Sequence, residues 1–216
     1  MSIRVLLADD HRIIRDGLRA LLEQQPDMQV IAEAENGREA VKLSKSLSPQ
    51  VVVMDLGMPD LNGVEATRQV LKDSPSIHVL ALSMHTDKRF IISMLDAGAS
   101  GYLQKDCAFD ELVNAVRAVA TGGTYLSPRI AGQVVKERLR PRVSAGPGAA
   151  NLTPKEREVV QLVAEGKSTK EVAALLDISV KTVETHRQHA MTKLGLRSVA
   201  ELTKFAVREG LTSLEM

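Results

Sequence analysis

Short apolar runs alternate with amphipathic segments over the first 121 residues of the chain. Apolar runs fit buried strands, and apolar positions that repeat with a helical period fit surface helices. This alternation is typical of βαβ units, which build a parallel sheet with right-handed crossovers. We therefore predict a five-stranded, doubly wound, flavodoxin-like α/β domain. Its strands would be 3–8, 29–34, 50–54, 77–82 and 101–103, and its helices 12–24, 37–47, 63–72, 87–97 and 108–120.

Residues 151–216 carry helical patterns only, and their boundaries are well marked. Ser or Thr followed three residues later by Glu predicts a capping box at three helix starts. Ser179 is a fourth N-cap candidate, and glycines that tolerate a left-handed backbone follow the helices. Four short helices with tight turns predict a compact bundle that contains a helix-turn-helix. The three boxes are Thr153–Glu156, Ser168–Glu171 and Ser198–Glu201, and the glycines are Gly166, Gly195 and Gly210.

Residues 122–150 are expected to link the two parts. Gly122 and Gly123 end the last helix of the α/β domain, and a further apolar stripe predicts a helix over 129–139. The Pro, Gly, Ala and Ser residues that follow predict a flexible tether. The predicted organisation is therefore an α/β domain (1–121), a linker (122–150) and an all-α domain (151–216).

Composition narrows the class of protein. A single cysteine, Cys107, excludes a disulfide framework. The N-terminus lacks the pattern of a signal peptide, and no apolar run approaches the ~20 residues that cross a bilayer. We therefore expect a soluble cytoplasmic protein with no membrane partner. The net charge of +1 does not by itself predict nucleic-acid binding.

Charged and hydroxyl residues gather where the predicted strands end. In doubly wound sheets, ligands bind beyond the carboxyl ends of the strands. Neighbouring carboxylates repel one another unless a cation compensates, and Mg²⁺ prefers such oxygen ligands. A lysine and a hydroxyl could bind phosphoryl oxygens, so we predict that Asp55 is a nucleophile that accepts a phosphoryl group. The residues at these strand ends are Asp9, Asp10, Asp55, Ser83 and Lys105.

Each of these signals also has a simpler interpretation. Asp9 and Asp10 could cap the following helix, Ser83 could be a turn residue, and Lys105 could be a solvated strand end. Their occurrence together, all at carboxyl ends of strands in one domain, favours a site.

The motifs of the first 121 residues resemble a two-component receiver domain. They are Asp9-Asp10, Asp55-Leu56-Gly57-Met58-Pro59, Asn62-Gly63, Ser83 and Gly101-Tyr102-Leu103-Gln104-Lys105. The resemblance implies that a sensor histidine kinase phosphorylates Asp55. It implies Mg²⁺ bound by Asp10, Asp55 and the Gly57 carbonyl, with Asp9 assisting through water. It also implies phosphoryl contacts from Ser83 and Lys105, and a switch role for Tyr102, which could otherwise be an ordinary half-buried strand tyrosine.

The third helix of the all-α domain has two distinct faces. Apolar residues define the packed face, and His186 lies beside it. Polar residues at helical spacing define an exposed strip, which could meet base edges in a major groove. For a helix considered alone, an ordinary solvated face is the better explanation of such a strip. The apolar set is Val180, Val183, Ala190 and Leu194, and the strip is Lys181, Glu184, Thr185, Gln188 and Thr192.

A second resemblance supports DNA binding. Residues 152–159, 166–173, 179–186 and 193–195 resemble the LuxR-type DNA-binding domain, so the whole chain resembles the NarL/FixJ family of response regulators. The resemblance implies a homodimer on promoter DNA, with RNA polymerase as a further partner. It implies base contacts from Glu184, Thr185 and Gln188, and phosphate contacts from Lys181 and Thr182. The implied dimer contact, which could otherwise be bundle core, comprises Val199, Leu202, Phe205 and Ala206.

We therefore predict a phosphorylation-controlled transcription regulator rather than an enzyme. A phosphatase of the aspartyl-phosphate type remains an alternative, although such enzymes need a further carboxylate and a cap, and the sequence shows neither. A protein-docking role for the near-neutral helical part is the other alternative.

Overall fold

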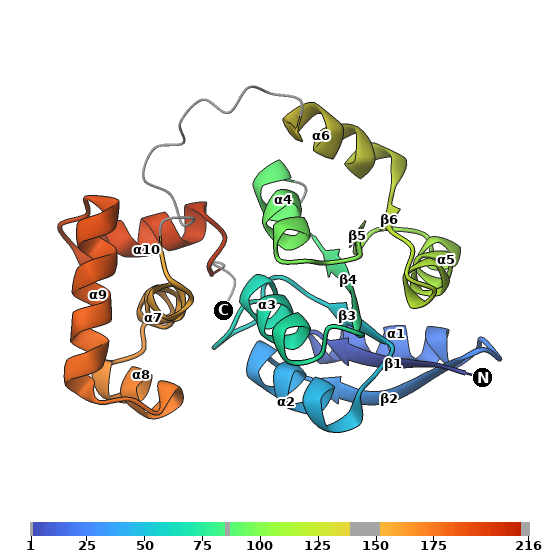
Figure 1. Cartoon of the computed structure of the whole chain (residues 1–216), viewed down its shortest axis with the longest axis horizontal. Helices are drawn as coiled ribbons and strands as arrows, with labels where there is room; N and C mark the ends of the chain where they lie inside the picture. Colours follow the sequence, from blue (N-terminus) through green and yellow to red (C-terminus); the bar gives the residue numbers. More distant parts are fainter. Residues whose placement is uncertain (1, 85–86, 139–151, 213–216) are drawn as a thin grey trace. The chain divides into compact units, whose positions relative to one another are not determined.

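The computed structural model describes residues 2–84, 87–138 and 152–212. The chain divides into two compact units, residues 1–140 and 141–216, which are described separately below (Figure 1). This division agrees with the predicted separation of an α/β part from a helical part.

The first unit is built on a parallel sheet with strand order β2-β1-β3-β4-β5-β6. The first five strands have the flavodoxin-like order predicted from the sequence. The strands are β1 (Ile3–Ala8), β2 (Met28–Ala34), β3 (Val51–Met54), β4 (His78–Ser83), β5 (Gly101–Gln104) and β6 (Tyr125–Leu126). The helices are α1 (Arg12–Leu22), α2 (Gly37–Leu47), α3 (Gly63–Asp73), α4 (Lys88–Asp96), α5 (Phe109–Ala120) and α6 (Pro128–Arg138).

Both faces of this sheet are covered by helices. Successive strand residues point to opposite faces, so Val5 packs in one core and Leu6 in the other. Helices α1 and α5 bury the first face, while α2, α3 and α4 bury the second (Figure 1). Because apolar packing occupies both faces, chemistry is left to the loops at the carboxyl ends of the strands.

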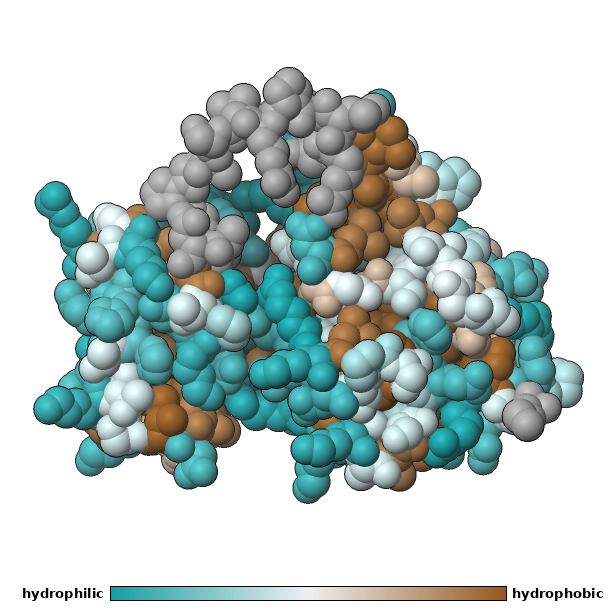
Figure 2. Space-filling model, in the orientation of Figure 1, coloured by the Kyte–Doolittle hydropathy of each residue, from teal (hydrophilic) through white to brown (hydrophobic). Residues whose placement is uncertain are grey.

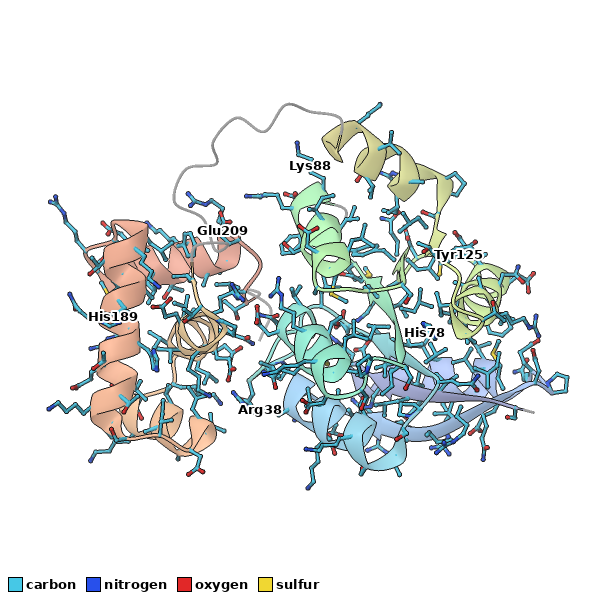
Figure 3. All side chains as sticks on the ribbon, viewed as in Figure 1. Arg38, His78, Lys88, Tyr125, His189 and Glu209 are labelled. Carbon is cyan, nitrogen blue, oxygen red and sulfur yellow. The ribbon has the colours of Figure 1, made fainter. Side chains whose placement is uncertain are left out.

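The prediction of five strands is corrected by a sixth. Strand β6 pairs in parallel with β5, and Tyr125 packs toward α5 (Figure 3). Helix α6 then packs against α4, with Ile130 fully buried in the core of this unit. Residues 122–138, assigned to the linker from the sequence, thus pack with the first unit. Strand β6 was missed because two residues are too few to show a periodic pattern.

Helix α6 exposes a large apolar side chain. Figure 2 shows hydrophobic surface in this region, where Val135 is 55% exposed. The remaining part of the predicted helix, Leu139, and the predicted tether 140–150 lie outside the described residues.

The second unit contains four helices, as predicted. Helix α9 contributes to two small cores, with Val183 in the core shared with α8, and Ala190 and Leu194 in the core shared with α7 and α10. Helix α9 is therefore anchored at both ends. The helices are α7 (Pro154–Ala164), α8 (Thr169–Leu176), α9 (Val180–Leu194) and α10 (Val199–Arg208).

Two of the three predicted capping boxes are confirmed, at Thr153 and at Ser168. The third is only half formed. Ser198 accepts a hydrogen bond from the Glu201 amide at 3.2 Å, but the Glu201 carboxylate accepts from the Arg197 amide at 2.7 Å. Ser198 is therefore the N-cap of α10, as predicted, and only the return hydrogen bond to Glu201 comes from one residue further upstream.

Across the three described ranges, the helices are all too short or too polar to span a membrane.

Candidate functional site

Carboxylates from two adjacent strands meet at one edge of the sheet. Strand β1 runs beside β3, and the Asp55 amide donates to the Ala8 carbonyl at 2.8 Å, so the residues that follow both strands are held together. Asp9 is 2% exposed and Asp55 5% exposed, while Asp10 is half-buried. One ligand atom from each, together with one from His11, lie within 4.8 Å of one another.

Lys105 brings a buried positive charge to this cluster. It follows β5, and its Nζ lies 2.7 Å from Asp9 Oδ2 and 3.0 Å from Asp55 Oδ2. Its side chain is only 6% exposed, so water screens these contacts weakly. Lys105 therefore bridges the two carboxylates. An ammonium in this position could also hold a small anion beside them.

The charges in this cluster shift one another's pKa values. Burial raises the pKa of Asp55, Asp9 and Asp10 raise it further, and Lys105 opposes them. Burial also lowers the pKa of Lys105, but the charges of Asp55 and Asp9 outweigh it, and the net pKa is raised. The ammonium is thus held charged, whereas the buried carboxylate needs compensating positive charge to stay ionised.

Ser83 and Tyr102 lie together beneath this edge. Both are fully buried, so the interpretation of Tyr102 as a half-buried strand residue is wrong. Burial raises the pKa of Tyr102 to about 12, and a hydrogen bond to Ser83 opposes the shift. The inward tyrosine and the serine at the end of β4 therefore form one connected pair.

The loop after Asp55 approaches its backbone closely. Asp55 Oδ1 accepts a hydrogen bond from the Leu56 amide at 2.8 Å, which leaves Oδ2 on the side of Lys105. A Cβ on Gly63 would lie only 2.0 Å from the Asp55 carbonyl oxygen, while one on Gly57 would have room, 4.0 Å from Asp55 Oδ2. Because Gly63 has no side chain, the start of α3 can pack directly against the Asp55 backbone.

Two residues near the site were missed from the sequence. His11 Nδ1 lies 2.9 Å from Asp10 Oδ1 and 3.3 Å from Asp9 Oδ1. Its position directly after the two aspartates was the available signal. Arg15 is 4% exposed and donates to the Asp9 carbonyl oxygen at 2.6 Å. A charged residue in phase with the packed Leu18 and Leu22 of α1 was the signal for it.

The cluster has the chemistry of a site for a hard divalent cation. Carboxylate oxygens are the ligands that Mg²⁺ prefers, and three aspartates converge within the reach of one ion. Asp9, Asp10 and Asp55 therefore fit the group that the receiver motifs imply.

The predicted DNA-contact strip lies on the open side of α9. Lys181, Glu184, Thr185 and Gln188 are exposed, as is His189 (Figure 3). Thr182 is half-buried, and its amide donates to the N-cap Ser179 Oγ at 3.0 Å. Thr182, the predicted phosphate contact, is therefore part of the capped start of α9.

Two further predictions for this unit meet a different environment. Val180, expected on the packed face, is 40% exposed, because it is the first residue of α9 and precedes the part of the helix that enters the core. Leu202, Phe205 and Ala206 of the predicted dimer contact are buried in the bundle core, whereas Val199 is 46% exposed. The structure thus leaves Val199 as the one member of that set with an open surface.

Comparisons with known proteins match both units. Residues 5–117 match the family described as response regulator receiver domain, and residues 150–206 match the bacterial regulatory proteins of the luxR family. The chain is 38% identical over 212 residues to the transcriptional regulatory protein MctR of Rhizobium johnstonii, covering 98% of this chain and 96% of that protein. The chain is a NarL/FixJ-family response regulator.

This regulator has other relatives of similar extent. The transcriptional regulatory protein UhpA of Escherichia coli K12 is 42% identical over 202 residues, covering 94% of this chain and 96% of that protein. Because such relatives span nearly the full length, the pairing of a receiver domain with a LuxR-type DNA-binding domain is a property of the whole chain. The regulator therefore belongs to a two-component system and regulates transcription.

Solved structures give the same result. RcsB of Salmonella enterica serovar Typhimurium, bound to the promoter rprA in the presence of the phosphomimetic BeF3⁻, is 27% identical to the regulator, with a TM-score of 0.63, and the match covers 95% of this chain and 98% of that one. A LuxR-family response regulator from Aurantimonas is 38% identical, with a TM-score of 0.62, and the match covers 65% of this chain and 100% of that one.

Proposed function

We propose that Asp55 accepts a phosphoryl group from a sensor histidine kinase in a Mg²⁺-dependent reaction in the cytoplasm, and that this controls dimerisation and promoter binding. The observation that carries the proposal is the Lys105 bridge, with its ammonium 2.7 Å from Asp9 and 3.0 Å from Asp55. Family membership supports it, because the match to the receiver family includes all three residues.

The proposed step is an in-line displacement. An oxygen of Asp55 attacks the phosphorus of a phosphohistidine, a P–O bond forms, the P–N bond breaks, and the electron pair leaves with the imidazole, which takes up a proton. Such transfers depend mainly on positioning and on neutralising charge. Oδ1 is occupied by the Leu56 amide, which makes Oδ2 the better nucleophile.

The surrounding residues supply the charge that the step needs. Lys105 moves from bridging two carboxylates to binding a phosphoryl oxygen, and Ser83 offers its hydroxyl to another. When bound, Mg²⁺ neutralises the carboxylates and the phosphoryl oxygens. Asp10, Asp55 and the Gly57 carbonyl would hold it, with Asp9 assisting through water, and Tyr102 would follow any movement of its partner Ser83.

The output would be a population shift toward a dimer that binds DNA. RcsB bound to promoter DNA with a phosphomimetic supports this for a relative of similar length. In the present chain, the exposed strip of α9 would meet base edges through Glu184, Thr185 and Gln188, while Lys181 and Thr182 contact phosphates. Of the residues assigned to dimer contacts, Val199 is the one that is open.

Phosphoryl uptake tests the first half of the proposal. The wild-type protein should take up one phosphoryl group from acetyl phosphate in the presence of Mg²⁺, measured by intact-protein mass, and Asp55→Asn should take up none. Asp106→Asn, at a carboxylate next to Lys105 but outside the cluster, is the matched control and should be labelled normally. Equal labelling of Asp55→Asn and wild type would overturn the assignment.

Salt-dependent DNA binding tests the second half. Lys181→Ala should weaken binding to a promoter fragment evenly across sequences and lower the slope of log K against log salt by about one. Gln188→Ala should instead relax the preference for particular bases, at about 1–3 kcal/mol for the affected base pair. Unchanged binding in the variant that combines Lys181→Ala with Gln188→Ala would favour the protein-docking alternative.

A further inference from the structure

Arg15 is a buried arginine whose side chain contacts the site only at the backbone of Asp9. It lies on α1, one turn after the acidic pair, and is 4% exposed. Its Nη1 donates to the Asp9 carbonyl oxygen at 2.6 Å. Its Nη2 donates to Glu35 at 2.8 Å, and its Nε to Glu33 at 3.4 Å. One side chain thus joins α1, the end of β2 and the residue that follows β1.

Asp9 is held at both of its peptide groups. Its amide donates to the Ala34 carbonyl at 3.1 Å, and its carbonyl accepts from Arg15. The preceding carbonyl, that of Ala8, accepts from the Asp55 amide at 2.8 Å. Since β1 ends at Ala8, the Arg15 contact takes the place of the next sheet hydrogen bond at Asp9, whose carboxylate lies 2.7 Å from Lys105 Nζ.

The chemistry of the contact requires a guanidinium. Three acceptors on different segments meet one planar fork of N–H donors, and a guanidinium stays charged at every relevant pH. A lysine has the charge, but its three N–H donors all belong to one nitrogen and cannot reach three separated acceptors as a planar fork does. Without the fork, the buried Asp9 carbonyl would lose its partner, and an orphaned buried acceptor costs about 1–3 kcal/mol.

We propose that Arg15 is a positioning residue for the phosphoacceptor site, which fixes the Asp9 backbone so that the carboxylates of Asp9, Asp10 and Asp55 converge on one cation. The proposal rests on the proposed Mg²⁺ chemistry. It predicts that Arg15 sets the affinity for Mg²⁺ even though it contacts no ligand atom of the cluster.

Calorimetric titration of the full chain with Mg²⁺ alone tests this proposal. Arg15→Met should weaken Mg²⁺ binding about tenfold or more, as loss of a group that orients metal ligands typically does. Arg19→Met is the matched control, because Arg19 lies one turn further along α1 and pairs with the same Glu33 at 2.8 Å. That variant should bind Mg²⁺ within about twofold of wild type.

Unfolding in urea, measured on both variants, separates positioning from stability. A purely structural Arg15 would lower the free energy of unfolding and leave the Mg²⁺ affinity of the folded protein unchanged, and that result overturns the proposal. If Arg15→Met does not fold, Arg15→Lys decides, since it should still bind Mg²⁺ at least about threefold more weakly, and wild-type affinity would overturn the proposal. Because Mg²⁺ binding is read directly, failure here is distinct from failure of Asp55 to take up a phosphoryl group.

Discussion

The two functional regions of this protein are built in opposite ways. The proposed phosphoacceptor cluster draws Asp9, Asp55 and Lys105 from three loops, buries them and couples their charges. The proposed DNA-contact strip takes its residues from a single helix and leaves them exposed to solvent. Burial makes charge interactions strong and makes each residue depend on its neighbours. The effects of two substitutions on the free energy of unfolding should therefore be non-additive in the first region and additive in the second.

Removing the Lys105 ammonium, which Asp9 and Asp55 share, is the strongest way to test this contrast. Lys105→Met leaves two buried carboxylates without their partner, and breaking a buried pair costs about 3–5 kcal/mol. Adding Asp9→Asn should recover part of that loss, with a coupling of about 0.5–3 kcal/mol in urea unfolding. Lys181→Ala and Gln188→Ala, two turns apart on α9, should add to within about 0.5 kcal/mol. Additive effects at Lys105 and Asp9 would contradict the expected non-additivity.

Backbone crowding gives the next largest effect. Gly63→Ala places a Cβ 2.0 Å from the Asp55 carbonyl oxygen, so either α3 or Asp55 must move. We expect a loss of about 1–3 kcal/mol together with slower phosphoryl uptake. Gly17→Ala on α1, where nothing lies within 4 Å of an added Cβ, is the matched control for uptake and for thermal melting. Equal behaviour of the two variants would show that the close approach is unimportant.

The pH dependence of stability tests whether the carboxylate is poised by burial. The pKa of Asp55 is raised in the folded state, so the folded protein binds this proton more tightly than the unfolded chain does. Its ionisation therefore destabilises the fold as pH rises from about 3.9 through the raised pKa. Asp55→Asn should be more stable than wild type at neutral pH without Mg²⁺, and the gap should close toward pH 4. A stability difference between the two proteins that grows on acidification would contradict a raised pKa for Asp55.

The smallest effect should come from the exposed region. Ser179 caps α9 by accepting from the Thr182 amide at 3.0 Å, and removing such a cap costs about 1 kcal/mol. Ser179→Ala should lower the melting temperature of the second unit, and weaken DNA binding only slightly. A change in phosphoryl uptake by this variant would show that the two regions are not independent.

The sequence predicted what local patterns encode. Strand order, helix positions and the convergence of Asp9, Asp55 and Lys105 follow from period and from the topology of parallel sheets. Arg15 was missed because its role depends on backbone contacts between segments that no periodic pattern records. The predicted dimer contact on α10 was ambiguous, because Leu202 and Phe205 have the spacing of a core and of an interface alike, and only their burial distinguishes the two.

Strand β6 and helix α6 determine where the first unit can be cut. A fragment ending at residue 121 would turn β5 into an unprotected edge strand and would empty the space filled by Ile130. Such edges recruit other chains, so that fragment should aggregate where one ending after residue 138 stays monodisperse. The receiver part up to residue 121 and the following segment of β6 and α6 therefore fold as one unit.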